Sequence, residues 1–294
     1  MLPAGRPKAY TTGVWLASVL LLSHALCQLA ESKNPCPGSA ALAAAASASL
    51  DVVQQAIAAQ LTPDTSLKVT DLPLLRPRQP WPYRNISTAL DAPYPTTNSS
   101  NGVTYSRLRH APIQNVTAGL MQWWFRQNLE RVVYYPWDGG NYTRYQMWHP
   151  RDHCHQKAIN RTTWLLQEFI VASKNFTRKD FQGFNASSEA QINLNMSVRS
   201  LNATGLTLSY VIYGYEMTKL THTWRNTAKG LDVTSELWVG NPSLQPQLNQ
   251  VANCAFSRGQ DPLAVARKLQ QHTVEEFGNL EKVLPYLYSV RNVG

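Results

Sequence analysis

The sequence predicts an α+β protein of the helix-grip type, in which a curved antiparallel sheet wraps around one long C-terminal helix. Five successive segments rich in β-branched and aromatic residues are bounded by turn residues, which is typical of a strand meander; they are 162–172, 192–198, 206–215, 217–224 and 231–240. The last segment, 263–284, has helical periodicity and follows Asp261 and Pro262, residue types favoured at a helix N-terminus. Such a sheet leaves an internal cavity, a natural site for a small apolar ligand.

The composition fits a globular protein and argues against nucleic-acid binding. The chain has 294 residues, of which 44% are hydrophobic, enough for one sizeable core. Its formal charge is +9, yet only 15% of residues are charged and the basic residues form no run. We therefore expect no nucleic-acid partner.

The N-terminus is typical of a cleaved secretory signal over residues 1–27. Arg6 and Lys8 precede an apolar run, 14–22, and small residues follow near Cys27. A membrane anchor would need about 20 apolar residues, roughly twice the length of this run. We expect a secreted protein without a stable membrane anchor.

Acceptor sites for N-glycosylation support the same compartment. Nine N-x-[ST] sequons occur, at Asn85, Asn98, Asn115, Asn141, Asn160, Asn175, Asn185, Asn195 and Asn202. The sequence therefore indicates a secreted, N-glycosylated protein.

Residues 28–104 are predicted to form an N-terminal extension, ahead of a compact domain over 105–294. The Ala-rich segment 40–61 has high helix propensity, and the Pro-punctuated segment 72–85 predicts an extended arm. The polar segment 91–102 predicts a loop. The arm is a possible contact between subunits of a homodimer.

Two further elements are expected early in the compact domain. Thr117 could cap a helix over 119–132, in which apolar residues recur at helical spacing. After the glycine-rich turn at 137–141, the segment 143–150 predicts a strand.

His272 and Glu276 are the first candidate site, because they are four residues apart on the final helix and therefore share a face. The same stripe contains apolar residues, among them Leu269, Leu280 and Val283. A polar pair within an apolar stripe needs a partner, and a divalent metal is one, since imidazole and carboxylate both bind zinc. The alternative is a pair at the edge of the stripe that contacts water.

A second cluster lies at the end of the predicted strand, where His149, His153 and His155 fall within seven residues. In an extended backbone these residues and Arg151 would share one face, although Pro150 makes the local geometry irregular. From the residues alone, both a polar loop and a metal site stay open.

Several familiar catalytic motifs do not occur in the sequence. It contains no H-E-x-x-H of a zincin protease, no G-x-S-x-G of a serine hydrolase, no glycine-rich phosphate loop and no C-x-x-C. These classes are therefore not indicated.

Four boxes together resemble the diacetylphloroglucinol hydrolase and phloretin hydrolase family. They are AGLMQWWF at 118–125, YQMWHPRDH at 145–153, THTWRNTAKGLDVTSELWVG at 221–240 and HTVEEFGNLEKVLPYLY at 272–288. The resemblance covers residues 116–288. It implies a Bet v 1-like helix-grip domain and a Zn²⁺ ion held by two histidines and two glutamates. The implied reaction is hydrolysis of the carbon–carbon bond between an acyl group and a phenolic ring.

The resemblance also implies which residues hold the zinc. His272 and Glu276 match the helical His-x-x-x-Glu pair of the family, and His149 matches the next ligand, with His153 as the alternative. Glu168, on the following strand, is the best match for the fourth ligand, and Glu189 is the reserve. The segment between the histidine box and Glu168 is shorter than in the family.

Cleavage of an aryl ketone requires proton transfer to the ring carbon, and the candidate acid/base residues are Asp152, His153, Tyr145 and His222. His222 could also bind a phenolic oxygen. Trp148, Trp224 and Trp238 are candidates for the lining of an aromatic pocket.

The leading hypothesis is a secreted zinc hydrolase that acts on acylated phenols or related polyketides. The alternative is a non-catalytic secreted protein that holds a hydrophobic small molecule in the same cavity. The intact His272/Glu276 pair favours the hydrolase, whereas the shortened segment before Glu168 favours the binding protein. A glycosylated surface protein would explain the sequons but not the polar pair.

Overall fold

The computed structural model of the chain describes residues 77–160, 162–170, 190–212, 215–244, 246–257 and 260–291. The predicted signal peptide (1–27), the predicted Ala-rich helix (40–61) and the reserve ligand Glu189 lie outside these residues.

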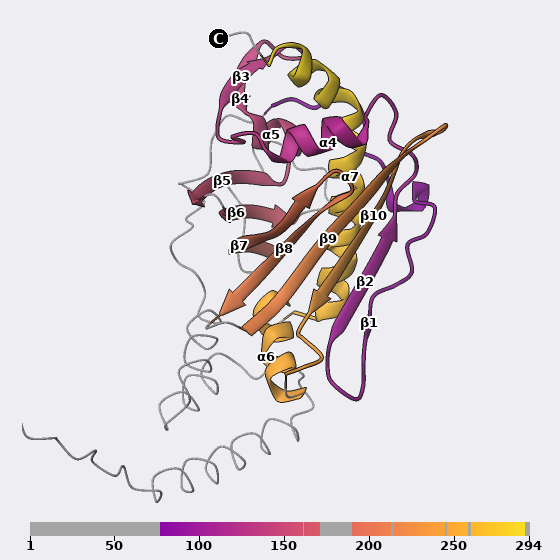
Figure 1. Cartoon of the computed structure of the whole chain (residues 1–294), viewed down its shortest axis with the longest axis vertical. Coiled ribbons are helices and arrows are strands. Elements are labelled where there is room, and N and C mark those ends of the chain that lie inside the picture. The colour runs from indigo at the N-terminus through magenta and orange to yellow at the C-terminus, as the bar shows by residue number, and fades with distance from the viewer. Residues whose placement is uncertain are drawn as a thin grey trace, which may run out of the picture.

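One large antiparallel sheet forms the centre of the structure, with the strand order β1-β2-β10-β9-β8-β7-β6-β5 (Figure 1). Six strands follow one another as a meander: β5 (His153–Asn160), β6 (Thr163–Ile170), β7 (Ala190–Asn202), β8 (Gly205–Ile212), β9 (Tyr215–Thr227) and β10 (Gly230–Val239). The earlier strands β1 (Thr96–Thr97) and β2 (Thr104–Arg109) add to β10. The predicted meander is therefore confirmed, and the N-terminal strands extend it.

The sheet has one face in the core. Along β10, buried and partly exposed residues alternate, as period-2 side-chain geometry requires. Leu231, Val233 and Leu237 point into the hydrophobic core, which they share with residues of α7.

Helix α7 (Pro262–Ser289) is the long C-terminal helix, and it runs along the sheet (Figure 1). The Asp261 carboxylate accepts a hydrogen bond from the Leu263 N–H at 3.0 Å, which confirms the predicted N-cap. Its apolar side chains, such as Leu280 and Val283, are fully buried, and so are His272 and Glu276. A second helix, α6 (Pro246–Ser257), packs against α7. Among the described helices, none is long and apolar enough to cross a membrane.

The predicted helix over 119–132 is shorter than expected. Helix α4 (Ala118–Phe125) begins after Thr117, whose hydroxyl accepts from the Leu120 N–H at 3.2 Å, as predicted. It ends at Phe125, and soon afterwards the Asn128 side chain accepts from the Glu130 N–H at 2.9 Å. This local bond stabilises a turn in place of further helix.

The prediction of a strand over 143–150 was wrong, because α5 (Arg144–Trp148) occupies this segment. Thr143 and Gln146 form a capping box, in which each side chain bonds the backbone N–H of the other. The T-x-x-Q spacing is the sequence signal for this helix start. A small hairpin of β3 (Val132–Tyr135) and β4 (Gly140–Thr143) precedes it.

The end of the predicted arm packs against the compact domain. The short 3-10 helix η2 (Ile86–Thr88) follows an extended segment whose residues contact α7: the Trp81 indole N–H donates to Asn279 Oδ1 at 2.9 Å. The predicted loop 91–102 contains β1. Residues just before 105 are thus part of the same packed body.

Candidate functional site

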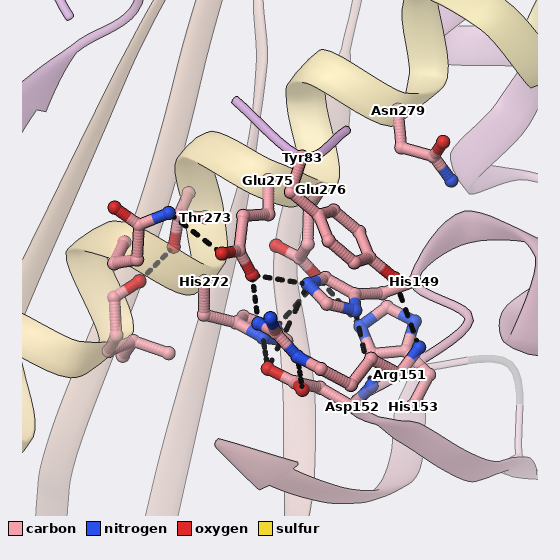
Figure 2. A network of polar contacts seen from close by, with 12 residues as sticks. Tyr83, His149, Arg151, Asp152, His153, His272, Thr273, Glu275, Glu276 and Asn279 are labelled. Atoms are coloured by element: carbon pink, nitrogen blue, oxygen red, sulfur yellow. Dashed lines mark hydrogen bonds and ion pairs between the residues drawn. The ribbon is translucent and has the colours of Figure 1, made fainter. Parts of the chain in front are cut away.

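The candidate site lies where the turn between α5 and β5 faces the middle of α7. Figure 2 shows His149, Asp152 and His153 from the turn directed toward His272, Glu275 and Glu276 from the helix. All six side chains are buried. Six polar side chains without solvent must satisfy one another or hold an ion.

The turn exists because α5 ends at Trp148, with His149 as its C-cap, and β5 begins at His153. The His153 N–H donates to the His149 carbonyl at 3.0 Å, which closes the turn. The backbone here is therefore not extended, and the histidines do not share one face in the way that an extended backbone would give. His153 is buried, whereas His155 is exposed after an irregularity in the pairing of β5 with β6.

His153, His272 and Glu276 form a compact ligand set. Glu276 Oε1 lies 2.7 Å from Nε2 of His153 and 3.2 Å from Nε2 of His272. The ligand atoms lie within 4.8 Å of one another, and all three residues are buried. On α7, the four-residue spacing of His272 and Glu276 places both on the face that meets the turn.

The opposite ring nitrogens show how the two imidazoles are held. Nδ1 of His153 lies 2.9 Å from the Tyr145 carbonyl oxygen, and Nδ1 of His272 lies 2.8 Å from Asp152 Oδ2. Carbonyl and carboxylate oxygens accept only, so both Nδ1 atoms carry the proton. In the neutral rings, each Nε2 is then an acceptor turned toward the Glu276 carboxylate.

Three mutually facing acceptors require positive charge between them, as protons or as a metal ion. A metal-bound histidine ordinarily donates its other N–H to a carboxylate or a backbone carbonyl, which is the arrangement of His272 and His153. The donor set, two imidazoles and a carboxylate, is one that zinc binds. The residues therefore fit a metal ion.

The electrostatics of the pair on α7 favour a cation as well. Burial opposes the charged form of His272, but the carboxylates of Glu276 and Asp152 outweigh it and raise the His272 pKa well above its ordinary value. Burial also opposes ionisation of Glu276, yet His272 and His153 hold its pKa well below the usual range. The Glu276 carboxylate is thus ionised at neutral pH.

His149 belongs to an adjacent network. Its Nε2 lies 3.0 Å from Glu275 Oε2, and its Nδ1 accepts from the Asp152 backbone N–H at 3.2 Å. Both nitrogens thus have protein partners other than Glu276. His149, Asp152 and His272 also offer three atoms within 4.8 Å of one another, so a second grouping of possible ligands overlaps the first.

Asp152 joins the two groups. Its Oδ1 accepts from Arg151 Nε at 2.7 Å and its Oδ2 from His272. Burial opposes ionisation of Asp152, but His149, His272 and Arg151 hold its pKa well below its ordinary range. Because these donors engage it, the Asp152 carboxylate orients His272 and is a poor proton carrier. The neighbouring Glu275 differs, because burial raises its pKa to about 7 against the opposing effect of Arg151.

Beside His272 and Glu276, a cavity opens between α7 and the sheet, and its empty space is about 810 Å³ when the open solvent at its mouth is included. Most of its lining is aliphatic or aromatic: Phe125, Leu129, Trp148, Trp164, Leu166, Met196, Leu206, Leu208, Leu220, Leu237, Phe256 and Leu269. The other lining residues are Tyr145, Thr218, His222, Thr273, His272 and Glu276. Such a cavity with a few polar groups suits an aromatic small molecule.

His222 is a buried residue of the cavity wall. Its Nδ1 lies 2.8 Å from the Ser235 hydroxyl oxygen, which lies 2.9 Å from Nε2 of His110. The one hydroxyl proton can serve only one of the two rings, so Ser235 couples their tautomers. Burial lowers the pKa of His222 to about 4, so this histidine is neutral at pH 7.

The other predicted residues have varied positions. Tyr145 lines the cavity and stacks on His153, with ring centroids 4.0 Å apart. Trp148 also lines the cavity, and Trp224 packs on Phe125 in the core. Trp238 contacts the Tyr105 ring at a tilt of 44° and does not line the cavity. Glu168 lies on β6, where its backbone is paired directly opposite His153.

Sequence reasoning missed three contributors: Glu275, Ser235 and Tyr83. Glu275 is next to the predicted ligand Glu276, but helical periodicity gives no reason to turn both inward. Ser235 and Tyr83 act through contacts between segments far apart in sequence. The adjacent acidic pair on an apolar helix was the available signal for Glu275.

Comparison with known proteins agrees with the resemblance of the four boxes. Residues 97–289 match the family described as DAPG hydrolase PhiG domain. A curated relative, phloretin hydrolase of Eubacterium ramulus, is 23% identical over 190 residues, which are 59% of this chain and 64% of the relative. The chain thus spans somewhat under two thirds of that relative. Since the family match extends over more than half of the sequence, the chain belongs to the DAPG hydrolase family.

Proposed function

We propose that the protein is a zinc-dependent hydrolase that cleaves the carbon–carbon bond between an acyl group and a phenolic ring. The observation that carries this proposal is the convergence of His153, His272 and Glu276 in one buried ligand set, of which His272 and Glu276 also line an apolar cavity. Membership of the DAPG hydrolase family and the similarity to a phloretin hydrolase support the reaction class.

In this proposal, Nε2 of His153, Nε2 of His272 and the Glu276 carboxylate hold the zinc. Glu168 is the proposed fourth ligand, because its backbone is paired directly opposite His153 and its residue type completes the set of two histidines and two glutamates. His149, the ligand first expected, is assigned to the surrounding hydrogen-bond network, since its Nε2 faces Glu275.

Zinc bound there would supply a polarised carbonyl and a water of lowered pKa. The protein's own residues orient the reactants and move the protons. His222 is neutral at pH 7 and lines the cavity, so it can exchange a hydrogen bond with a phenolic oxygen or accept a proton there. Tyr145 holds the ring of His153 by stacking and offers a hydroxyl near the cavity.

The cavity lining favours an aromatic acyl-phenol or a related polyketide. Aromatic side chains such as Phe125, Trp148 and Trp164 offer faces for a ring, while the polar groups are few. Water is poorly accommodated by the apolar part of such a cavity, which limits side reactions of a bound ketone.

The first experiment is elemental analysis of the purified protein beside the His272→Ala variant and the control His155→Ala, whose histidine is exposed. We expect about one zinc per chain in the wild type and the control and none in His272→Ala. Incubation with acylphloroglucinols should then release a carboxylic acid only from the zinc-containing samples. A folded wild-type protein without metal would contradict the proposal.

A second candidate function is supported by the size and apolar lining of the cavity: binding of a hydrophobic small molecule without catalysis. It predicts a protein that binds acyl-phenols with nearly equal affinity in the wild type and in Glu276→Ala and releases no acid. The same preparations distinguish the two functions.

We further propose that the protein is secreted and N-glycosylated, and that its sheet and α7 form a Bet v 1-like helix grip. The sample for elemental analysis can be recovered from the medium of secreting eukaryotic cells. Its N-terminus should begin near residue 28, and its mass should fall on deglycosylation. A protein that stays inside the cell and keeps its first 27 residues would contradict secretion. Gel filtration of the same sample tests the proposed homodimer.

A further inference from the structure

Residues 81–86, which span the end of the N-terminal arm and the start of η2, lie along α7 next to the candidate zinc site. Gln271 Nε2 donates to the Arg84 carbonyl at 2.9 Å, and Gln271 Oε1 accepts from the Ile86 N–H at 2.7 Å. Arg84 also pairs with Glu281 of α7. These contacts fix the backbone of the arm on the helix that carries His272 and Glu276.

The surface of α7 is shaped to receive the arm. A Cβ atom at Gly278 would lie only 2.6 Å from Cδ of Arg84, so the glycine allows the arginine side chain to cross the helix closely. The next residue, Asn279, accepts from Trp81 and donates to the carbonyls of Met147 and Trp148, both at 2.8 Å. The arm, α7 and α5 are therefore joined through one side chain.

Tyr83 is the arm residue nearest to the site. Its ring stacks on His149, with centroids 4.8 Å apart and 19° between the planes. His149 in turn stacks on His272, at 4.6 Å and 12°. Three aromatic rings thus form a continuous stack that ends on a proposed zinc ligand (Figure 2).

Tyr83 also contacts the residue that organises the carboxylates. Its hydroxyl accepts from the Arg151 backbone N–H at 3.1 Å, and the Arg151 guanidinium lies 4.8 Å from the Tyr83 ring centroid. Arg151 pairs with both Asp152 and Glu275, the partners of His272 and His149. The side chain of Tyr83 therefore contacts both the ring stack and its charge network.

We propose that Tyr83 is a positioning residue of the zinc site: its ring closes the stack that sets the orientation of His272. The inference rests on the proposed zinc site and assigns part of that site to a segment that precedes the family match at 97–289. A metal ligand whose ring can tilt binds less tightly, and loss of such supporting contacts typically weakens metal affinity about 10- to 100-fold.

The test compares Tyr83→Leu and Tyr83→Phe in the full chain. The zinc dissociation constant is measured by competition with a chromophoric chelator, and Co²⁺ substitution gives a visible spectrum that reports ligand geometry. We expect Tyr83→Leu to bind zinc about tenfold more weakly, with an altered Co²⁺ spectrum. Tyr83→Phe keeps the ring and should remain within about threefold of the wild type.

Tyr94→Leu is the matched control, because Tyr94 precedes the same family match but is 56% exposed and contacts Arg267, away from the histidines. It should bind zinc like the wild type. Wild-type affinity and spectrum in folded Tyr83→Leu would overturn the inference, and so would an equal loss in Tyr83→Phe, which would assign the effect to the hydroxyl. Should Tyr83→Leu not fold, Tyr83→Met replaces it, while the Tyr83→Phe result still decides.

The two proposals fail in different ways. A folded wild-type chain that binds no zinc contradicts the proposed function and removes the basis of the inference. A wild-type chain that binds one zinc with an affinity unchanged in Tyr83→Leu contradicts the inference alone.

Discussion

Two groups of buried histidines lie at α7, and histidine pKa values shift in opposite directions in the two groups. In the first group, His153 and His272 face the carboxylate of Glu276. In the second group, His110 and His222 share only the hydroxyl of Ser235 and pack on Phe277. The pKa of His272 is raised, whereas burial lowers the pKa of His110 to about 3 and that of His222 to about 4.

The difference shows that burial alone does not identify a metal ligand. All four histidines are fully or almost fully buried. Carboxylates create a demand for positive charge in the first group, while a neutral hydroxyl satisfies neutral imidazoles in the second. The partners, and not the degree of burial, therefore distinguish the group that we propose to hold a cation from the group that forms neutral hydrogen bonds.

The largest expected effect is the loss of zinc from the first group alone. His153→Ala removes an Nε2 ligand, so elemental analysis should find no stoichiometric zinc. His110→Gln, a change in the second group, should retain about one zinc per chain. His149→Ala should retain zinc with reduced affinity, because its Nε2 faces Glu275. Zinc retained by His153→Ala but lost by His149→Ala would reverse our assignment of the ligand.

A smaller effect is expected from the partners of the histidines. Asp152→Asn keeps the shape of the side chain but weakens the acceptor of the His272 Nδ1–H, so we expect zinc affinity to fall about 10- to 100-fold in a chelator competition. Ser235→Ala is the corresponding change in the second group and should leave zinc affinity unaltered. Equal losses in both variants would mean that the two groups are not separate.

The sequence was sufficient for much of the fold but for only part of the site. Alternating apolar residues predicted β6 to β10, and helical spacing with Asp261 and Pro262 predicted α7. These patterns are local. The turn that separates His153 from His149 depends on the capping box of α5, so an extended backbone was expected there instead.

The partners of each histidine could not be predicted for a different physical reason. His272 meets Asp152, 120 residues away, and His222 meets Ser235 across neighbouring strands. Such pairs depend on strand register and helix rotation, which a periodic pattern does not specify. The choice between His149 and His153 as the ligand was therefore open from sequence, and our proposal of His153 rests on the direction of their nitrogens.

The smallest expected effect is a loss of folding stability at low pH, caused by His110 and His222 of the second group. The folded-state pKa values of His110 and His222 lie below the roughly 6.5 of an unfolded chain. The unfolded chain then binds more protons as pH falls below about 6.5, so the stability present above that pH is lost progressively toward pH 4. Each histidine contributes at most about 1.4 kcal/mol per pH unit.

Urea unfolding of the zinc-free protein between pH 7 and pH 5 measures this slope. His222→Gln should show a shallower loss of the free energy of unfolding than the wild type, because one of the two groups no longer titrates. A slope that His222→Gln leaves unchanged would show that folding does not lower the pKa of His222. Zinc must first be removed with a chelator, because zinc binding is itself pH-dependent and would change the slope.

Helix α7 supplies both His272 and Glu276 to the candidate metal site and Leu269 and Thr273 to the cavity wall. A cavity ligand that favours one position of this helix would also move two of the proposed metal ligands. Thermodynamic linkage then requires reciprocity: the factor by which an occupied cavity changes zinc affinity equals the factor by which zinc changes the affinity for that ligand. Under the proposed function, helix α7 would therefore couple the two binding events.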